Sequence, residues 1–252
     1  MLSQNHHLYR GRDGLWIYSG PQDSFTKIHA DPEIVGAVAA KHRAQNPEDS
    51  AQSTSFLEIE QQLLSRGVLT TRSNPSFQRE PVIEVVGDGL VAEWVKRIAE
   101  SSGIAYQQGA ALTIDCAGWL PDQRWRAEEE SKPQQPKHYC HYEPGSIVLG
   151  PFSIPGRTPQ YRDLRGRRLA AAAQPEQMRE LWGYLESGTE ILPPVEDEAS
   201  AALAAGLLMA DVLAYLRGTP IPSENHQLVL HRETSTLTRH YVLPLPSVAV
   251  NG

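Results

Sequence analysis

The sequence predicts two folded units, an α+β module followed by a larger α/β domain. Three observations support this division. Short alternating strands precede helices in the first 75 residues, and the segment Thr71–Pro81 then lacks apolar periodicity and contains two prolines, as a linker does. From Val82 onward, buried-type strands alternate with helical stretches, which is typical of an α/β layer. We therefore expect one domain at residues 1–75 and another at 76–252.

The N-terminal module begins with a hairpin. Leu8–Arg10 and Leu15–Tyr18 flank a turn that contains two glycines, and Ser24–His29 alternates well enough for a third strand. Pro32 stands at a first helical turn, and Phe56–Arg66 places its apolar residues on one face of a second helix. Three strands with following helices predict a winged-helix-like module.

The second domain shows its elements in order along the chain. The predicted strands are Pro81–Val86, Leu112–Cys116 and Ile147–Leu149, with a terminal hairpin at Gln227–His231 and Leu237–Leu243. The predicted helices are Val91–Ser102 and an alanine-rich helix, Glu198–Arg217, with Asp197 as its cap and Gly218 as its stop. Glu128–His138 is charged and contains prolines, so we interpret it as a loop or a frayed helix end.

Composition excludes several classes of protein. The net charge of −7 offers no general attraction to nucleic acid or to an anionic membrane, and two cysteines are too few for a disulfide framework. The low cysteine count favours a reducing cytoplasm, and no apolar run reaches the ~20 residues of a membrane span. We therefore expect a cytoplasmic protein without a membrane partner. A winged-helix DNA-binding regulator is one alternative. Residues 1–75, however, carry seven basic and eight acidic side chains, without the positive field that binding to duplex DNA requires.

Gly87-Asp88-Gly89 lies between a predicted strand and a predicted helix, which is half of a nucleotide-binding fingerprint. Asp88 places a negative charge where a phosphate would lie, and the following segment offers no acidic ribose ligand. We interpret the motif as a tight turn and predict no bound cofactor.

Two further groups have functional side chains. His138, Cys140 and His141 are metal ligands by type, but a strand would send His141 to the opposite face, so we predict no metal site. The basic cluster Arg162, Arg165, Arg167 and Arg168 fits either an acidic partner or a solvated helix face. No nucleophile and base stand in a recognisable arrangement, and the sequence therefore predicts a chain that is not an enzyme.

A family resemblance comes from the stretch IVLGPFSIPGRTPQYRDLRGRR, which starts at Ile147. It is similar to the E1-like (ThiF-like) partner proteins of YcaO-type azoline cyclodehydratases. The matching positions are Gly150-Pro151, Pro155-Gly156, Thr158-Pro159, Leu164 and Arg167-Arg168. The resemblance covers most of residues 80–252 and implies a degenerate E1-like domain of Rossmann type. It also implies that residues 1–75 form a recognition element for a ribosomal precursor peptide.

The chain departs from the family at its metal site. The family commonly holds zinc with two Cys-x-x-Cys pairs. Here Gln160 and Asp163 replace the first pair, and residues within Ser247–Asn251, none of them cysteine, replace the second. The resemblance therefore implies a variant without zinc.

The resemblance also implies a function. In the family, a leader peptide adds as a strand to the small sheet and packs against the third helix, a recognised mode of peptide binding. We accordingly predict a non-catalytic partner that presents a precursor peptide to a YcaO cyclodehydratase for thiazole or oxazole formation. The predicted peptide-binding residues are Ser24, Phe25, Thr26, Lys27, Ile28, Ile59, Gln62, Leu63 and Arg66. An ATP-dependent E1-like adenylating enzyme is the alternative, and a homodimer is left open.

Overall fold

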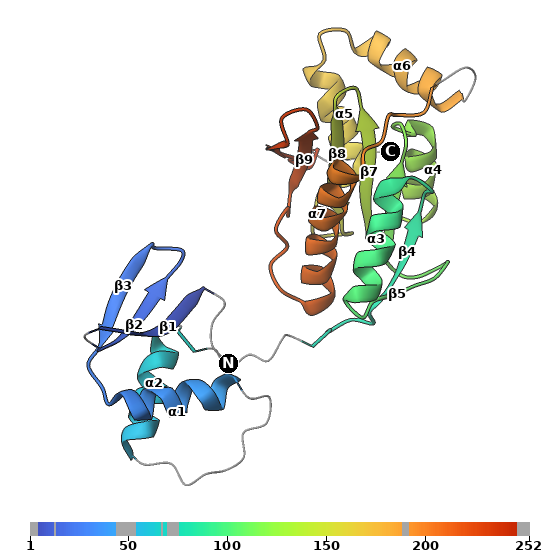
Figure 1. The fold of residues 1–252 in the computed structure, drawn as a ribbon. Helices are drawn as coiled ribbons and strands as arrows, with labels where there is room; N and C mark the ends of the chain where they lie inside the picture. The colour runs from blue at the N-terminus through green and yellow to red at the C-terminus, as the bar shows by residue number, and fades with distance from the viewer. Residues whose placement is uncertain are drawn as a thin grey trace. The chain divides into compact units, whose positions relative to one another are not determined.

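The structure is a computed structural model, and it describes residues 5–12, 14–43, 54–66, 68–69, 76–187 and 192–245. The chain divides into two compact units, Met1–Ser76 and Phe77–Gly252. Figure 1 shows the elements of each unit, coloured in their order along the chain.

Unit 1 contains a three-stranded antiparallel sheet in the order β1-β2-β3. Its elements are β1 (His6–Gly11), β2 (Gly14–Ser19), β3 (Ser24–Ile28), α1 (Pro32–Arg43) and α2 (Thr54–Ser65). The predicted hairpin and third strand are thus confirmed. Ile17 of β2, Val35 and Val38 of α1 and Leu63 of α2 are buried together and form the core of this unit. Its likeness to a winged helix stays a prediction.

Unit 2 is built on a seven-stranded mixed sheet in the order β10-β9-β8-β7-β6-β4-β5. The strands are β4 (Val82–Val86), β5 (Ala105–Tyr106), β6 (Thr113–Ala117), β7 (Lys137–Glu143), β8 (Ser146–Ser153), β9 (His226–His231) and β10 (Thr236–Tyr241). The helices are α3 (Leu90–Ser101), α4 (Asp122–Ser131), α5 (Tyr161–Ala171), α6 (Pro175–Ser187) and α7 (Glu198–Arg217). Strands β4 to β7 pair in parallel and the rest are antiparallel, which confirms a mixed α/β domain.

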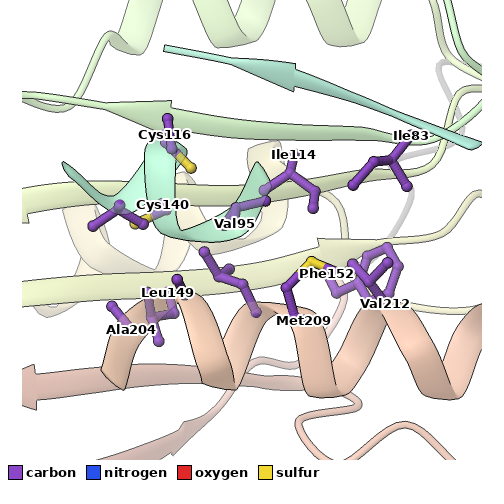
Figure 2. Packing of buried hydrophobic residues seen from close by; sticks show 14 of the residues in the cluster. Ile83, Val95, Ile114, Cys116, Cys140, Leu149, Phe152, Ala204, Met209 and Val212 are labelled. Atoms are coloured by element: carbon purple, nitrogen blue, oxygen red, sulfur yellow. The ribbon is translucent and has the colours of Figure 1, made fainter. Parts of the chain in front are cut away.

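Helices cover the central sheet on both faces. α3 and α7 lie side by side on one face (Figure 1), and Figure 2 shows apolar side chains of the sheet packed against Ala204, Met209 and Val212 of α7. A second cluster contains Trp125 of α4 and Tyr161 of α5, together with side chains from β7 and α6. Unit 2 is therefore a layered α/β domain with two apolar clusters.

Helix α7 has the bounds that its sequence predicts. The Asp197 carboxylate accepts a hydrogen bond from the Ser200 amide at 2.8 Å, and Gly218 adopts the left-handed conformation that ends the helix. Among the described residues, α7 is the one helix long and apolar enough to cross a membrane. Leu208 and Val212 are nevertheless fully buried within the domain. This burial is that of a helix in the core of the domain.

The prediction of a loop or frayed helix end at Glu128–His138 is confirmed up to Pro136, because α4 ends at Ser131 and a loop leads from it to β7. Lys137 and His138 differ from the prediction, since they already belong to β7, the middle strand of the sheet. The composition of β7 is unusually polar for a buried strand. Its side chains have polar partners: Lys137 pairs with Glu128, and His138 pairs with Asp211. Pairing removes most of the cost of burying these groups.

Candidate functional site

The free edge of β3 borders a groove in unit 1. β3 pairs with β2 on one side, and among the described strands it has no neighbour on the other. The groove has a volume of about 130 Å³ and lies between the end of β3 and α2. Its lining includes six of the predicted peptide-binding residues: Lys27, Ile28, Ile59, Gln62, Leu63 and Arg66. The structure thus brings the two predicted segments together.

The remaining three predicted residues lie elsewhere on β3. Ser24, Phe25 and Thr26 are exposed and do not line the groove. The Phe25 ring is 59% exposed and packs against Tyr18, with ring centroids 4.9 Å apart. Within the groove, Leu63 is a core residue, whereas Gln62 and Arg66 are exposed. The groove therefore combines an apolar floor with polar side chains at its rim.

In unit 2, the turn between β4 and α3 lies at the carboxyl edge of the parallel strands, where α/β folds bind ligands. Gly87 has a φ of +112°, and a Cβ there would collide with the Cys116 carbonyl oxygen of β6. A Cβ on Gly89 would collide with the Glu196 carboxylate. Two adjoining cavities, of about 370 and 420 Å³, open at this edge and share Asp88.

Carboxylates occupy the starts of two helices at this edge. Glu196 accepts a hydrogen bond from the Leu90 amide of α3 at 2.7 Å. Glu186 accepts hydrogen bonds from the Gln123 and Arg124 amides of α4, both at 2.7 Å. Amides in the first turn of a helix have no partner within the helix, so a carboxylate is a favourable occupant. With the exposed Asp88, these side chains give the edge a negative character.

An ion pair lies beside the same cavities. Asp115 of β6 is fully buried, and Arg124 of α4 reaches it with two hydrogen bonds, from Nη1 to Oδ2 at 2.8 Å and from Nη2 to Oδ1 at 2.9 Å. Burial opposes the charge on Arg124, but Asp115 and Glu128 more than compensate, and the pKa of the guanidinium rises above its ordinary value. The guanidinium therefore stays charged, and its two hydrogen bonds tie α4 to the end of β6.

Two free cysteines border the first cavity. Cys116 and Cys140 are in register on neighbouring parallel strands, and both are buried (Figure 2). The hydrogen bond with Cys116, together with burial, raises the pKa of the Cys140 thiol well above its ordinary value. A protonated thiol is a poor nucleophile. This environment does not favour Cys140 as an attacking group.

The side chains of His138, Cys140 and His141 on β7 each contact a different partner. His138 Nε2 lies 3.0 Å from Asp211 Oδ2, and His141 Nε2 lies 3.3 Å from Glu143 Oε1. Burial lowers the pKa of His141 and favours its neutral form. Within the described part of the chain, no three His, Cys, Asp or Glu side chains gather as metal ligands. This arrangement supplies no chelating set.

Gln160 and Asp163 stand where the family has its first cysteine pair, and both take part in hydrogen bonds. Asp163 Oδ2 accepts from the Gln160 amide at 2.7 Å, which caps α5, and Asp163 Oδ1 accepts from the Leu245 amide at 2.9 Å. Arg167 also donates to the carbonyls of Leu243 and Pro244. These residues do not fit a thiolate zinc site, and hydrogen bonds hold the C-terminal segment on α5. The other replaced pair, at Ser247–Asn251, lies outside the described residues.

We expect the purified protein to contain far less than one equivalent of zinc, because neither replaced pair supplies a thiolate. Elemental analysis after gel filtration in metal-free buffer measures the content directly. A stoichiometric zinc ion that survives dialysis against a chelator would contradict this prediction.

Two arginines of the basic cluster on α5, Arg165 and Arg168, form ion pairs within the domain. Arg165 pairs with the buried Asp122 at 2.7 Å, and Arg168 pairs with Glu143. These contacts support a structural role for the two side chains and do not single them out as a docking surface.

No family model and no curated protein matches the sequence. The fold, however, is similar to those of a biosynthetic enzyme and a heterocyclase. MccB of E. coli is similar over 100% of this chain and 96% of its own, with 13% identity and a TM-score of 0.60. MccB has also been solved with ATP and with N-formylated MccA; the latter structure has a TM-score of 0.63 at 12% identity, covering 100% and 99% of the two chains. The heterocyclase TruD has a TM-score of 0.70 at 13% identity, and the match covers 98% of this chain but 42% of TruD.

These neighbours correct the prediction that the chain is not an enzyme. MccB is named a biosynthetic enzyme and TruD a heterocyclase, and both share the fold of this chain. The prediction relied on missing motifs, namely the cysteine pairs and a contiguous nucleophile and base. The absence of local motifs does not exclude an enzyme, because side chains that lie far apart in the sequence can meet at the sheet edge of such a fold.

Sequence reasoning missed the carboxylates at this edge. Glu186 and Glu196 lie 62 or more positions from the amides they cap, and Arg124 lies on a helix that was not predicted. The sequence alone favours a tight turn at Gly87-Asp88-Gly89 and predicts no site at this edge. No local signal indicated which acidic side chains would reach it.

Proposed function

We propose that this chain acts as an enzyme in the modification of a ribosomally made precursor peptide, and that it binds this peptide in the groove between β3 and α2. The observation that carries the proposal is the free edge of β3 beside that groove. An added strand would form backbone hydrogen bonds with β3, and its side chains would enter the groove. The MccB structure with a bound peptide partner supports a peptide as ligand.

The composition of the groove favours a particular kind of peptide. Ile28 and Ile59 offer apolar surface, while Lys27 and Arg66 place positive charge nearby. We propose a leader segment with one apolar anchor and an adjacent acidic residue. The expected cytoplasmic location belongs with this proposal, since Cys116 and Cys140 are both free thiols.

A YcaO-type cyclodehydratase is the proposed protein partner. The chain spans 42% of TruD. In this proposal, thiazole or oxazole formation requires both chains. An ATP-dependent adenylating activity is the second candidate, supported by the MccB structure with ATP.

Replacing Gln62 with tryptophan is expected to weaken leader binding roughly tenfold or more, because the indole would fill the groove where a peptide anchor packs. The measurement is fluorescence polarisation of a labelled precursor peptide from the same gene neighbourhood, titrated with the full-length chain. Gln61→Trp is the matched control. Gln61 is the preceding residue of α2 and equally exposed, but it does not line the groove.

Equal affinity of both variants and the native chain would remove the groove as the binding site. If the native chain shows no binding, either alone or with a YcaO-type protein added, the proposed function fails as a whole. Loss of binding in both variants would point to a general defect of α2, which circular dichroism would detect.

A further inference from the structure

The two cysteines of the chain lie on neighbouring strands of unit 2. Cys116 of β6 and Cys140 of β7 are partners in the parallel register of these strands, and Figure 2 shows both side chains in the same apolar cluster. Neighbouring strands lie about 4.8 Å apart, and side chains in register point to the same face of the sheet. This spacing is within the range of Cα separations that a disulfide spans. The two thiols are therefore placed to react with each other.

The cavities at the carboxyl edge give a small molecule access to one of these thiols. Cys116 borders both cavities, whereas Cys140 borders only the first. Cys116 is 7% exposed and Cys140 is 1% exposed. A water molecule takes about 30 Å³ in the liquid, so the first cavity, of about 370 Å³, has room for a small oxidant. Such an oxidant would reach the Cys116 sulfur first.

The hydrogen bond between the two thiols assigns them different roles. This bond raises the pKa of Cys140, so the Cys140 S–H group donates and the Cys116 sulfur accepts. A donor favours the thiolate form of the sulfur that accepts it, and the thiolate is the form that attacks. Cys116 is therefore the group that attacks first, and Cys140 keeps its proton for a later step.

Tyr142 of β7 adds a polar group to the first cavity. Its side chain lines this cavity and is buried, and its hydroxyl has no hydrogen-bond partner among the residues that the structure describes. Burial raises the pKa of this hydroxyl, which therefore stays protonated and can donate. A buried polar group without a partner favours a polar guest, which would satisfy its hydrogen bond.

We propose that Cys116 and Cys140 form an oxidisable dithiol site, which hydrogen peroxide converts to a disulfide within the chain. The Cys116 sulfur attacks one peroxide oxygen, the O–O bond breaks, and a sulfenic acid and one water form. The Cys140 sulfur then attacks the sulfenic sulfur, and the S–S bond forms as the S–O bond breaks. The Cys140 proton leaves with the hydroxide as a second water. The two sulfurs are oxidised by two electrons in total, and the peroxide is reduced.

The test is mass spectrometry of the reduced full-length chain after timed exposure to hydrogen peroxide, with the remaining thiols blocked by N-ethylmaleimide under denaturing conditions. We expect the native chain to lose both reactive thiols together and to become lighter by two hydrogen atoms. A thiol reductant should restore both. Peptide mapping should identify a linked pair of peptides that contain Cys116 and Cys140.

Two serine variants separate the roles of the cysteines. In Cys140→Ser, oxidation should stop at a sulfenic acid on Cys116, which dimedone traps. In Cys116→Ser, the loss of the Cys140 thiol should be at least roughly tenfold slower than the loss of thiols in the native chain, because the remaining thiol is buried and protonated. Equal rates in the two single variants would contradict the assignment of Cys116 as the attacking group.

The native chain alone can overturn the proposal, so the result does not depend on the folding of the variants. Two thiols that stay reactive, under conditions that fully oxidise free cysteine, would overturn it. A sulfinic acid on Cys116 beside a free Cys140, or a disulfide between two chains on a non-reducing gel, would do the same. The site lies in unit 2 and its readout involves no peptide, so failure of the proposed peptide binding would leave this result interpretable.

Discussion

Replacing Asp211 with alanine is expected to lower the free energy of unfolding of unit 2 by about 3–5 kcal/mol. Asp211 lies on the core helix α7 and is 1% exposed. Its carboxylate contacts His138 Nε2 at 3.0 Å and accepts the Ser223 amide at 2.9 Å and the Ser223 hydroxyl. Alanine would leave these buried groups without an acceptor, and the cost of such unpaired groups exceeds the net gain from pairing them. Urea denaturation followed by tryptophan fluorescence measures the change.

Asp211→Asn is the control for this prediction. The amide oxygen can still accept one of the Ser223 hydrogen bonds, so we expect a smaller loss than for alanine. A loss below about 1 kcal/mol in Asp211→Ala would mean that water or a repacked side chain replaces the carboxylate. The network would then not be what fixes α7 to β7.

The same carboxylate gives the stability a defined pH dependence. Burial alone raises the pKa of Asp211, but hydrogen bonds and charge from His138, with the hydrogen bonds from Ser223, outweigh burial and bring the pKa below its ordinary value. A carboxyl group whose pKa is lower in the folded state stabilises the protein fully above its unfolded pKa, near 3.9. This contribution is lost as the pH falls through the folded value. Below pH 4, the native chain should therefore lose stability more steeply than Asp211→Asn.

The sequence predicts local elements well in this chain, because their causes lie within a few residues. α7 carries its own cap in Asp197 and its own stop in Gly218, and its bounds agree with the prediction. The first hairpin is similarly encoded by alternation and glycines. β7 behaves differently, since Lys137 and His138 become tolerable in a buried strand only when Glu128 and Asp211 are in place.

The candidate site, like the fold, could be predicted only in part from the sequence. Both segments bordering the groove, β3 and α2, were identified, because a strand edge and an amphipathic helix each leave a local pattern. The acidic edge of unit 2 was seen only as Asp88 within a compromised nucleotide motif. Glu196 comes from a segment more than 100 positions away from the turn that it occupies. Only the folded topology brings such a side chain to the turn.

Arg124→Ala is expected to destabilise unit 2 by about 3 kcal/mol, because it leaves the Asp115 carboxylate buried without its cation. Asp115 is fully buried, and both of its oxygens accept from the guanidinium. Arg124→Lys should recover only part of the loss, since an ammonium group cannot reproduce the two parallel hydrogen bonds. Arg126→Ala is the matched control on α4, because its side chain is exposed and forms no ion pair with another residue that the structure describes.

A double mutant separates the ion pair from the packing of the Arg124 side chain. If the unpaired charge causes the loss, Asp115→Asn combined with Arg124→Ala should be more stable than Arg124→Ala alone. Additive losses in the two single variants would instead assign the effect to packing. Because Asp115 and Arg124 line the cavity next to Gly87, loss of the pair should also disturb the position of α4 at this edge.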